Sequence, residues 1–121
     1  MIEVRKELNK YLKTLHPRVY FQIAPETATF PYIIYDLPNS FSDGEGGEII
    51  TLDIDGWDYN EIGDTTTIET LMQTINVIDK KTLSTEDMAV TFFLENKIPL
   101  IDDDKRIKRR KYVYSGRLIR R

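Results

Sequence analysis

The sequence predicts an α+β domain, a mainly antiparallel sheet of about four to five strands with two helices packed on one face. Two segments place apolar residues at helical spacing, and several others alternate apolar and polar residues as strands do. No linker, internal repeat or low-complexity stretch interrupts the 121 residues. We therefore treat residues 1–121 as a single domain, which is long enough to bury a core without metal or disulfide staples.

The N-terminal segment IEVRKELNKYLKTL predicts the first helix. Val4, Leu8 and Leu12 recur at helical spacing on one face, and Pro17 ends the pattern. A short apolar piece, VYFQIA, and a turn at PETATFP follow. The aromatic and β-branched run PYIIYDL then predicts a strand.

The next strand is expected after a loop, PNSFSDGEGG, that is rich in glycine and acidic residues. The segment EIITLDIDGWD alternates strictly. Ile50 and Ile54 face one way, whereas Asp53, Asp55 and Trp57 face the other. This strand is therefore expected to have one face in the core and one face that is wet or used for contact.

A second helix is predicted in the segment TTTIETLMQTINVIDKK. Asp64 before it is a good N-cap, and Ile68, Met72 and Ile75 belong to its apolar stripe. MAVTFFLEN alternates as a strand, and KIPLIDDDKR is expected to be a loop. The C-terminal basic stretch alternates again, which predicts a last strand.

Charge is sorted unevenly along the chain, although the net charge is only −3. Residues 105–121 hold nine of the seventeen basic residues and no acidic one. Twelve acidic residues and no basic residue lie between Arg18 and Lys80. Opposite fields on one subunit favour head-to-tail contact between copies as readily as binding of a foreign polyanion.

Candidates for catalysis and metal binding are weak. The lack of cysteine excludes thiol catalysis and zinc–thiolate sites. His16, the only histidine, has no nucleophile in a recognisable setting and is expected to interact with the last carbonyls of the first helix. Asp53, Asp55 and Asp58 are interpreted as a polar sheet face, because calcium ligands surround a tight turn and DGEGGE lacks the spacing of a calcium loop. The glycine-rich loop also lacks a phosphate-binding lysine. The sequence therefore predicts no catalytic residue, no cofactor and no metal site.

No segment predicts contact with a membrane. No apolar run approaches the roughly 18 residues that a spanning helix needs. The charged N-terminus lacks the apolar centre of a secretory signal.

The basic stretch KRIKRRKYVYSGRLIRR admits a second interpretation, as a nucleic-acid-binding strand. Lys108, Arg109, Arg110 and Lys111 would contact phosphates, and either of the tyrosines that follow would stack on a base. No helix-turn-helix, RNP or zinc motif accompanies them, and the rest of the chain is strongly acidic. A protein partner, including another copy of this chain, fits the charges better.

The segments taken together resemble the tail-completion or tail-terminator family of long-tailed bacteriophages. They are the amphipathic first helix, TFPYIIYDL, the acidic glycine-rich loop, ITLDIDGWD, the helix after it, and the late strand rich in Arg and Tyr. The resemblance covers nearly the whole chain, with no counterpart for residues 96–104. None of its segments is a catalytic signature.

The resemblance implies a structural virion subunit with no enzymatic activity and no cofactor. Proteins of that family form a ring, commonly a hexamer, that caps the tail tube, stops its polymerisation and joins the tail to the head connector. The implied partners are further copies, the tail-tube protein and the head-completion or connector protein, with DNA only as cargo in the channel. The implied location is the virion, at the head–tail junction, and the host cytoplasm during assembly.

In such a ring, an acidic patch on one subunit can meet a basic patch on the next. We expect the outward faces of the two charged strands to make this contact, through Asp53, Asp55, Trp57, Asp58, Lys108, Arg109, Arg110 and Lys111. The loop 38–47 is expected to order against the tube or the connector. A head-side neck or adaptor protein of the connector is the alternative, and a nucleic-acid-binding module is the less favoured one.

Overall fold

The computed structural model describes all 121 residues, in two α-helices, one 3₁₀ turn and seven strands. In chain order these are α1 (Ile2–Leu15), β1 (Val19–Phe21), β2 (Tyr32–Asp36), β3 (Ser40–Ser42), β4 (Glu48–Tyr59), α2 (Thr66–Ile75), η1 (Asn76–Ile78), β5 (Thr82–Ser84), β6 (Met88–Ile101) and β7 (Ile107–Arg120). The predicted α+β class is confirmed.

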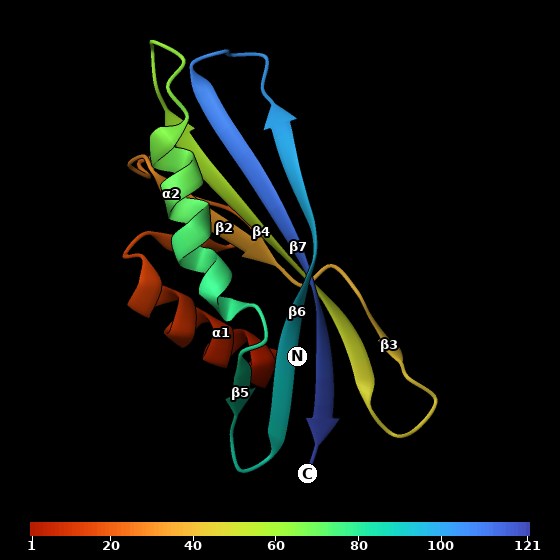
Figure 1. Ribbon diagram of the computed structural model, residues 1–121. Helices are drawn as coiled ribbons and strands as arrows, with labels where there is room; N and C mark the ends of the chain where they lie inside the picture. Colours follow the sequence, from red (N-terminus) through yellow and green to blue (C-terminus); the bar gives the residue numbers. More distant parts are fainter.

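All seven strands belong to one sheet. Their order is β1-β2-β4-β7-β6-β5, and β3 pairs with β4 beside this path. Only β1 and β2 run parallel, and every other pair is antiparallel. The long strands β4, β6 and β7 twist so strongly that they cross in the view of Figure 1. The sheet is mainly antiparallel as predicted, but it has more strands than the expected four to five.

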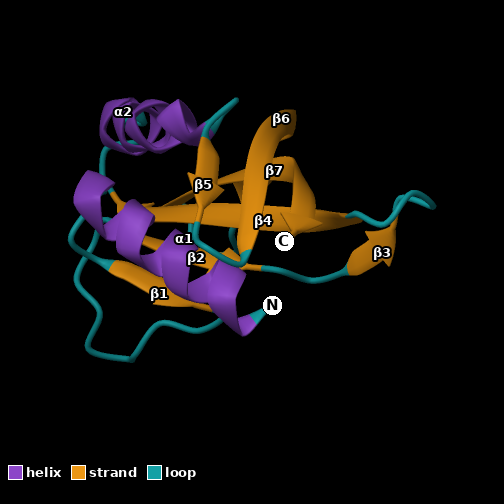
Figure 2. Ribbon diagram, turned by 90° about the horizontal axis from the view of Figure 1, so that it is seen from below, coloured by secondary structure: helices purple, strands orange, loops and turns teal.

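Both helices pack on the same face of the sheet (Figure 1; Figure 2). Helix α1 buries Val4, Leu8 and Leu12, the apolar face that its spacing predicts. Helix α2 likewise buries its apolar stripe, and the two sets join the inward residues of β2, β4, β6 and β7 in one core. Full burial of each such aliphatic side chain contributes about 1.5–3 kcal/mol.

Helix α2 lies close against β4 at Gly56. A Cβ atom at this position would stand 2.5 Å from the Met72 Sδ and 2.9 Å from the Ile68 Cδ1. The absence of a side chain therefore lets α2 pack directly over this end of β4. The same end of β4 carries the acidic and aromatic candidates from the sequence.

Two segments predicted as loops are partly strands. Within PNSFSDGEGG, Ser40–Ser42 pairs with Glu48–Ile50 of β4. Strand β6 continues to Ile101, so only residues 102–106 form the turn to β7. Pro99 is tolerated within β6 because β5 covers only the first part of its outer edge, and a missing N–H matters little at a free edge.

The β6–β7 hairpin is interrupted by one β-bulge. The register shifts between Leu94 and Asn96, so Glu95 is an extra residue on β6. A bulge of this kind bends the strand and increases its twist. We call the hairpin beyond the bulge, residues 96–112, the β6–β7 arm.

Candidate functional site

The acidic and basic candidates lie on adjacent strands. β4 and β7 pair antiparallel, with Asp55 opposite Lys111 and Trp57 opposite Arg109. Directly opposite residues share one face of a sheet and lie close enough to interact. The two predicted patches therefore form one mixed surface within a single subunit. They are not the separate surfaces that the sequence led us to expect.

Strand alternation divides the eight candidates between the two faces of the sheet. Five lie on the face that neither helix covers, namely Asp53, Asp55, Trp57, Arg109 and Lys111. We call it the helix-free face. Asp58, Lys108 and Arg110 lie on the opposite, helix-covered face, where Asp58 is only 5 % exposed. These three therefore do not share the outward position that the sequence predicted for them.

Two carboxylates on the helix-free face compete for one lysine. The Lys111 Nζ lies 3.9 Å from the Asp53 Oδ2 and 3.9 Å from the Asp55 Oδ2. Burial raises the pKa of both carboxyl groups above the usual range, and the lysine offsets this only in part. The carboxylates are therefore poorly solvated and incompletely compensated in the isolated subunit.

An aromatic row continues the helix-free face beyond the charges. The Arg109 guanidinium lies 3.9 Å from the centroid of the Trp57 ring, within cation–π range. Trp57 stacks on Tyr32 at 6.0 Å, and Tyr32 stacks on Phe30 at 5.2 Å. Sequence reasoning missed Tyr32 as a site residue. PYIIYDL does not alternate apolar and polar residues, so its pattern does not show that Tyr32 and Ile33 lie on opposite faces of β2.

Three polar atoms on the helix-free face are buried without a hydrogen-bond partner. They are the Asp55 Oδ1, the Trp57 Nε1 and the Arg109 Nε. A buried polar group that lacks a partner typically costs about 1–3 kcal/mol, and native proteins contain few of them. Their concentration makes this face the least satisfied part of the sheet surface in the isolated subunit.

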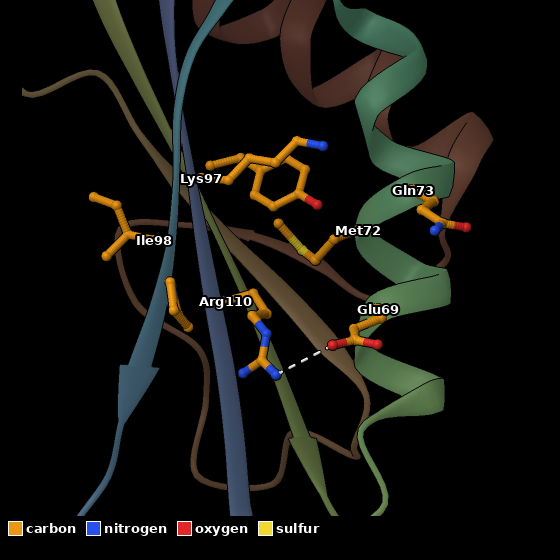
Figure 3. A pocket seen from close by; sticks show the side chains of 8 residues that line it. Glu69, Met72, Gln73, Lys97, Ile98 and Arg110 are labelled. Atoms are coloured by element: carbon orange, nitrogen blue, oxygen red, sulfur yellow. Dashed lines mark hydrogen bonds and ion pairs between the residues drawn. The ribbon is translucent and has the colours of Figure 1, made fainter.

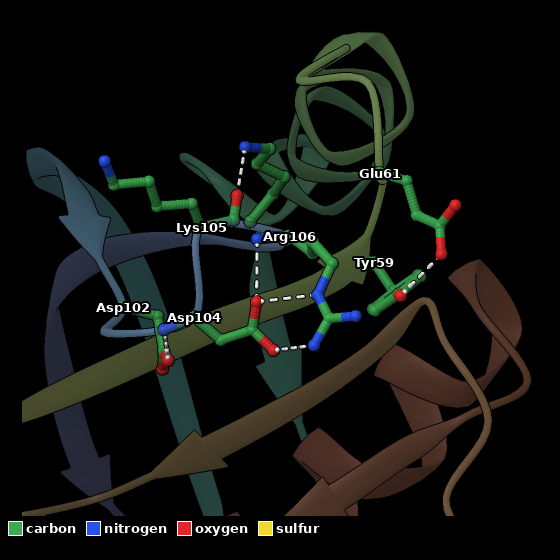
Figure 4. A network of polar contacts seen from close by, with 7 residues as sticks. Tyr59, Glu61, Asp102, Asp104, Lys105 and Arg106 are labelled. Atoms are coloured by element: carbon green, nitrogen blue, oxygen red, sulfur yellow. Dashed lines mark hydrogen bonds and ion pairs between the residues drawn. The ribbon is translucent and has the colours of Figure 1, made fainter.

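The tip of the β6–β7 arm carries a local network of polar contacts and lies beside Tyr59 at the end of β4 (Figure 4). Arg106 makes a forked pair with Asp104, with both N–O distances 3.0 Å, and its guanidinium lies 5.5 Å from the Tyr59 ring centroid. The Tyr59 hydroxyl donates to the Glu61 carboxylate at 2.9 Å. Hydrogen bonds from Arg106 lower the pKa of Asp104. The acidic turn within the segment predicted as a loop is thus locally structured.

A groove of about 480 Å³ separates α2 from the β6–β7 arm (Figure 3). Its wall on the helix includes Glu69 and Met72, and its wall on the arm includes Lys97 and Pro99. The Arg110 Nη2 lies 3.5 Å from the Glu69 Oε1 across the groove. We call this the α2–arm groove. It was not predicted, because it depends on the pairing of β6 with β7.

His16 and the acidic side chains do not form an arrangement that is typical of catalysis. The His16 Nε2 donates to the Pro31 carbonyl at 3.0 Å, and the Arg18 Nε donates to the same oxygen at 2.9 Å. The side chain of His16 is thus hydrogen-bonded to the residue before β2. It does not bond the last carbonyls of α1, as the sequence led us to expect. No group of three or more His, Cys, Asp or Glu side chains is placed to hold a metal ion. Neither helix is long and apolar enough to cross a membrane.

The tyrosines of the nucleic-acid interpretation are not available for stacking. Tyr114 is fully buried, and its hydroxyl donates to the Asn76 Oδ1 at 2.8 Å. Tyr112 is 9 % exposed. Lys108 and Arg110 point to the opposite sheet face from Arg109 and Lys111. The structure therefore contradicts a single basic strip with interleaved stacking rings.

Comparison with known proteins adds evidence about the fold. No protein-family model and no curated protein sequence matches the chain. A solved structure described as the virion of a native gene transfer agent (GTA) particle contains a chain with the same fold. The similarity covers 95 % of this chain and 90 % of that chain, with a TM-score of 0.66 and 16 % sequence identity.

Proposed function

We propose that this chain is a structural subunit of a virion and has no enzymatic activity. Its fold is shared, over nearly its full length, with a chain of a GTA virion. Its sequence separately resembles phage tail-terminator proteins. On this proposal, copies of the chain form a ring, a hexamer, that caps the tail tube, stops its polymerisation and joins the tail to the head connector. The ring resides at the head–tail junction after assembly in the host cytoplasm.

The observation that best supports this proposal is the group of buried polar atoms on the helix-free face that lack hydrogen-bond partners. Rotation of these buried side chains on contact would let a neighbouring protein donate a hydrogen bond to the Asp55 Oδ1 and accept one each from the Trp57 Nε1 and the Arg109 Nε. Desolvated groups of this kind give a contact its specificity, and the aromatic row next to them gives it apolar area. We assign this face to a virion neighbour, the tail tube or the connector.

Complementation of a virus that lacks this gene tests the proposal. We expect Arg109→Glu to leave heads and tails unjoined, because it removes the cation–π contact with Trp57 and places another carboxylate near Asp55. Electron microscopy of lysates and the titre of infectious particles measure the outcome. Circular dichroism of the purified variant checks that the fold is intact.

Arg117→Glu is the matched control, since Arg117 is an exposed residue of the same strand and the same sheet face. It should give a normal titre. A normal titre from Arg109→Glu would contradict the assignment of the helix-free face.

The head-side alternative is tested with purified particles. A tail-side subunit should co-sediment with tails that lack it and stop tube extension, whereas a neck or adaptor protein should co-sediment with heads. A nucleic-acid-binding module would bind oligonucleotides with an affinity that falls steeply with salt. We expect binding to tails.

A further inference from the structure

The β3–β4 hairpin projects from the body of the subunit (Figure 1; Figure 2). β3 is hydrogen-bonded to β4 alone, and all three of its residues are exposed. One of them is an aromatic residue, Phe41, which is 55 % exposed. Residues 40–47 also carry Asp43 and Glu45 and no basic residue. We call residues 40–47 the acidic tip.

The acidic tip has a preformed turn. The Asp43 Oδ1 accepts hydrogen bonds from the Glu45 N–H at 2.7 Å and the Gly47 N–H at 3.0 Å. These bonds lower the pKa of Asp43, so its carboxylate is ionised at neutral pH. Gly44 and Gly46 have φ angles of 84° and 91°, a conformation that other residues rarely adopt. A preformed turn loses little conformational entropy when it binds.

The α2–arm groove has the opposite character. A second hollow of about 340 Å³ adjoins it at Arg110, toward the tip of the arm. We include this hollow in the α2–arm groove from here on. Together their linings contain four basic side chains, Lys97, Lys105, Lys108 and Arg110, against two acidic ones, Glu69 and Asp102. The remaining lining is largely apolar and includes Ile101, which is 95 % exposed. The groove is therefore suited to an acidic segment that carries an apolar side chain.

The acidic tip and the groove lie at opposite ends of one subunit. β3 pairs with β4 at Ile49, whereas Arg110, which lines the groove, pairs with β4 at Gly56. Seven residues of strand separate these points, which is about 23 Å at 3.3 Å per residue. A subunit therefore cannot place its own tip in its own groove, but it can reach the groove of a neighbour.

We propose that the acidic tip of one copy inserts into the α2–arm groove of the next copy. Phe41 contacts the apolar lining, and Asp43 and Glu45 face the four basic side chains. The contact joins two different surfaces, so it runs head to tail and closes into a ring when the rotation between subunits divides a full turn. This inference rests on the proposed ring and names the surfaces that build it.

A second copy fits the groove better than nucleic acid does. The lining has an excess of two basic side chains, which matches the two carboxylates of the acidic tip. This excess is too small to offset the many charges of a polyanion that follows the groove past Glu69 and Asp102. The acidic tip offers few charges on a compact turn, and the same chain supplies it at equal concentration. We therefore expect the groove to bind a second copy, and binding of an oligonucleotide in its place would contradict the inference.

The lack of cysteine in the chain makes disulfide trapping a direct test. A Glu45→Cys chain and an Ile101→Cys chain are mixed and mildly oxidised. We expect a covalent heterodimer to form at least tenfold faster than between Glu86→Cys and Ile101→Cys chains, where Glu86 is an exposed control position. A chain with both Glu45→Cys and Ile101→Cys should give a ladder that ends at the ring size. Equal trapping in the two mixtures overturns the inference.

Charge reversal provides a second readout. Glu45→Lys and Lys105→Glu should each weaken self-association about tenfold in sedimentation velocity experiments, because like charges then meet. A one-to-one mixture of the two variants should restore it, since each interface in an alternating ring again joins opposite charges. Failure of the mixture to restore association overturns the inference, because loss in the single variants alone would also follow from misfolding.

The outcomes also separate this inference from the proposed function. Rings that form without trapping between positions 45 and 101 overturn the acidic tip contact and leave the virion ring standing. A chain that stays monomeric both alone and on tail tubes contradicts both. Lys105→Glu that abolishes binding of a labelled oligonucleotide without affecting self-association assigns the groove to nucleic acid and overturns the inference.

Discussion

The two faces of the β4–β7 pair consist of alternate residues of the same strands. Only on one of them do the buried polar side-chain atoms all have hydrogen-bond partners. On the helix-covered face, Ile54 is fully buried and the Tyr114 hydroxyl has a partner in Asn76. On the helix-free face, Asp55, Trp57 and Arg109 each bury a polar atom without a partner. The difference indicates that one face supplies most of the stability of the subunit, and it supports the proposed use of the other face as a contact surface.

The largest effect on stability should come from the helix-covered face. Ile54→Ala removes a fully buried side chain from the core, and we expect the free energy of unfolding to fall by about 2–5 kcal/mol. Ile34→Ala, on the helix-free side of β2, should cost less than half as much because Ile34 is only half-buried. Urea denaturation measures both. Equal losses would break the comparison.

Overpacking provides the next test. A Cβ atom at Gly116 would lie 2.7 Å from the Ile50 Cγ1 and 2.8 Å from the Phe92 Cε1. Gly116→Ala should therefore cost about 1–3 kcal/mol and lower the midpoint of thermal unfolding. The neighbouring Ser115→Ala, on the helix-free face, should stay within about 0.5 kcal/mol of wild type. A larger loss at Ser115 would show that the helix-free face also supports the fold.

A smaller loss is expected from Tyr114→Phe. The change removes the hydrogen bond to Asn76, which contributes about 1 kcal/mol. Burial raises the pKa of Tyr114, so the folded state keeps a proton that the unfolded chain releases near pH 10. The free energy of unfolding of the wild type should then fall as pH rises above about 10. Urea titrations at neutral and high pH should show a shallower fall for Tyr114→Phe.

The smallest effect should have the opposite sign. Asp55 has a raised pKa, so the folded state holds its proton more tightly than the unfolded chain, and ionisation at neutral pH destabilises the fold. Asp55→Asn should therefore slightly increase the free energy of unfolding at pH 7. The gain should disappear as pH falls below about 4, where the wild-type carboxyl is protonated in both states. The same variant should lower head–tail joining, which sharpens the contrast between the faces.

Local sequence patterns predicted the helices and strands in which apolar residues recur with the same spacing from end to end. The helical spacing of Val4, Leu8 and Leu12 and the alternation of Ile50 and Ile54 both lead directly to buried faces. Their physical basis is local, since the period of a helix or strand fixes which residues share a face. The inward face of β4 was therefore visible in the sequence.

Features that depend on an interrupted period or on distant pairing were missed. The alternation of β6 breaks at Glu95, where the bulge adds a residue, so the strand was expected to end near Asn96. β3 is short and polar, and only its pairing with β4 makes it a strand. The contact of Asp55 with Lys111 joins residues far apart in sequence, and no local pattern records it. For this reason the mixed charge of the helix-free face was not foreseen.

Pro99 affects how the subunit behaves when many copies are crowded together. The outer edge of β6 lies open along the arm, and an open edge with regular N–H groups can recruit foreign strands into growing fibrils. Pro99 lies within this stretch of β6, and a proline in an edge strand has no N–H group to offer and hinders such recruitment. If copies of the chain assemble into the proposed ring, they are crowded together, and this single imino acid would help to keep the assembly finite.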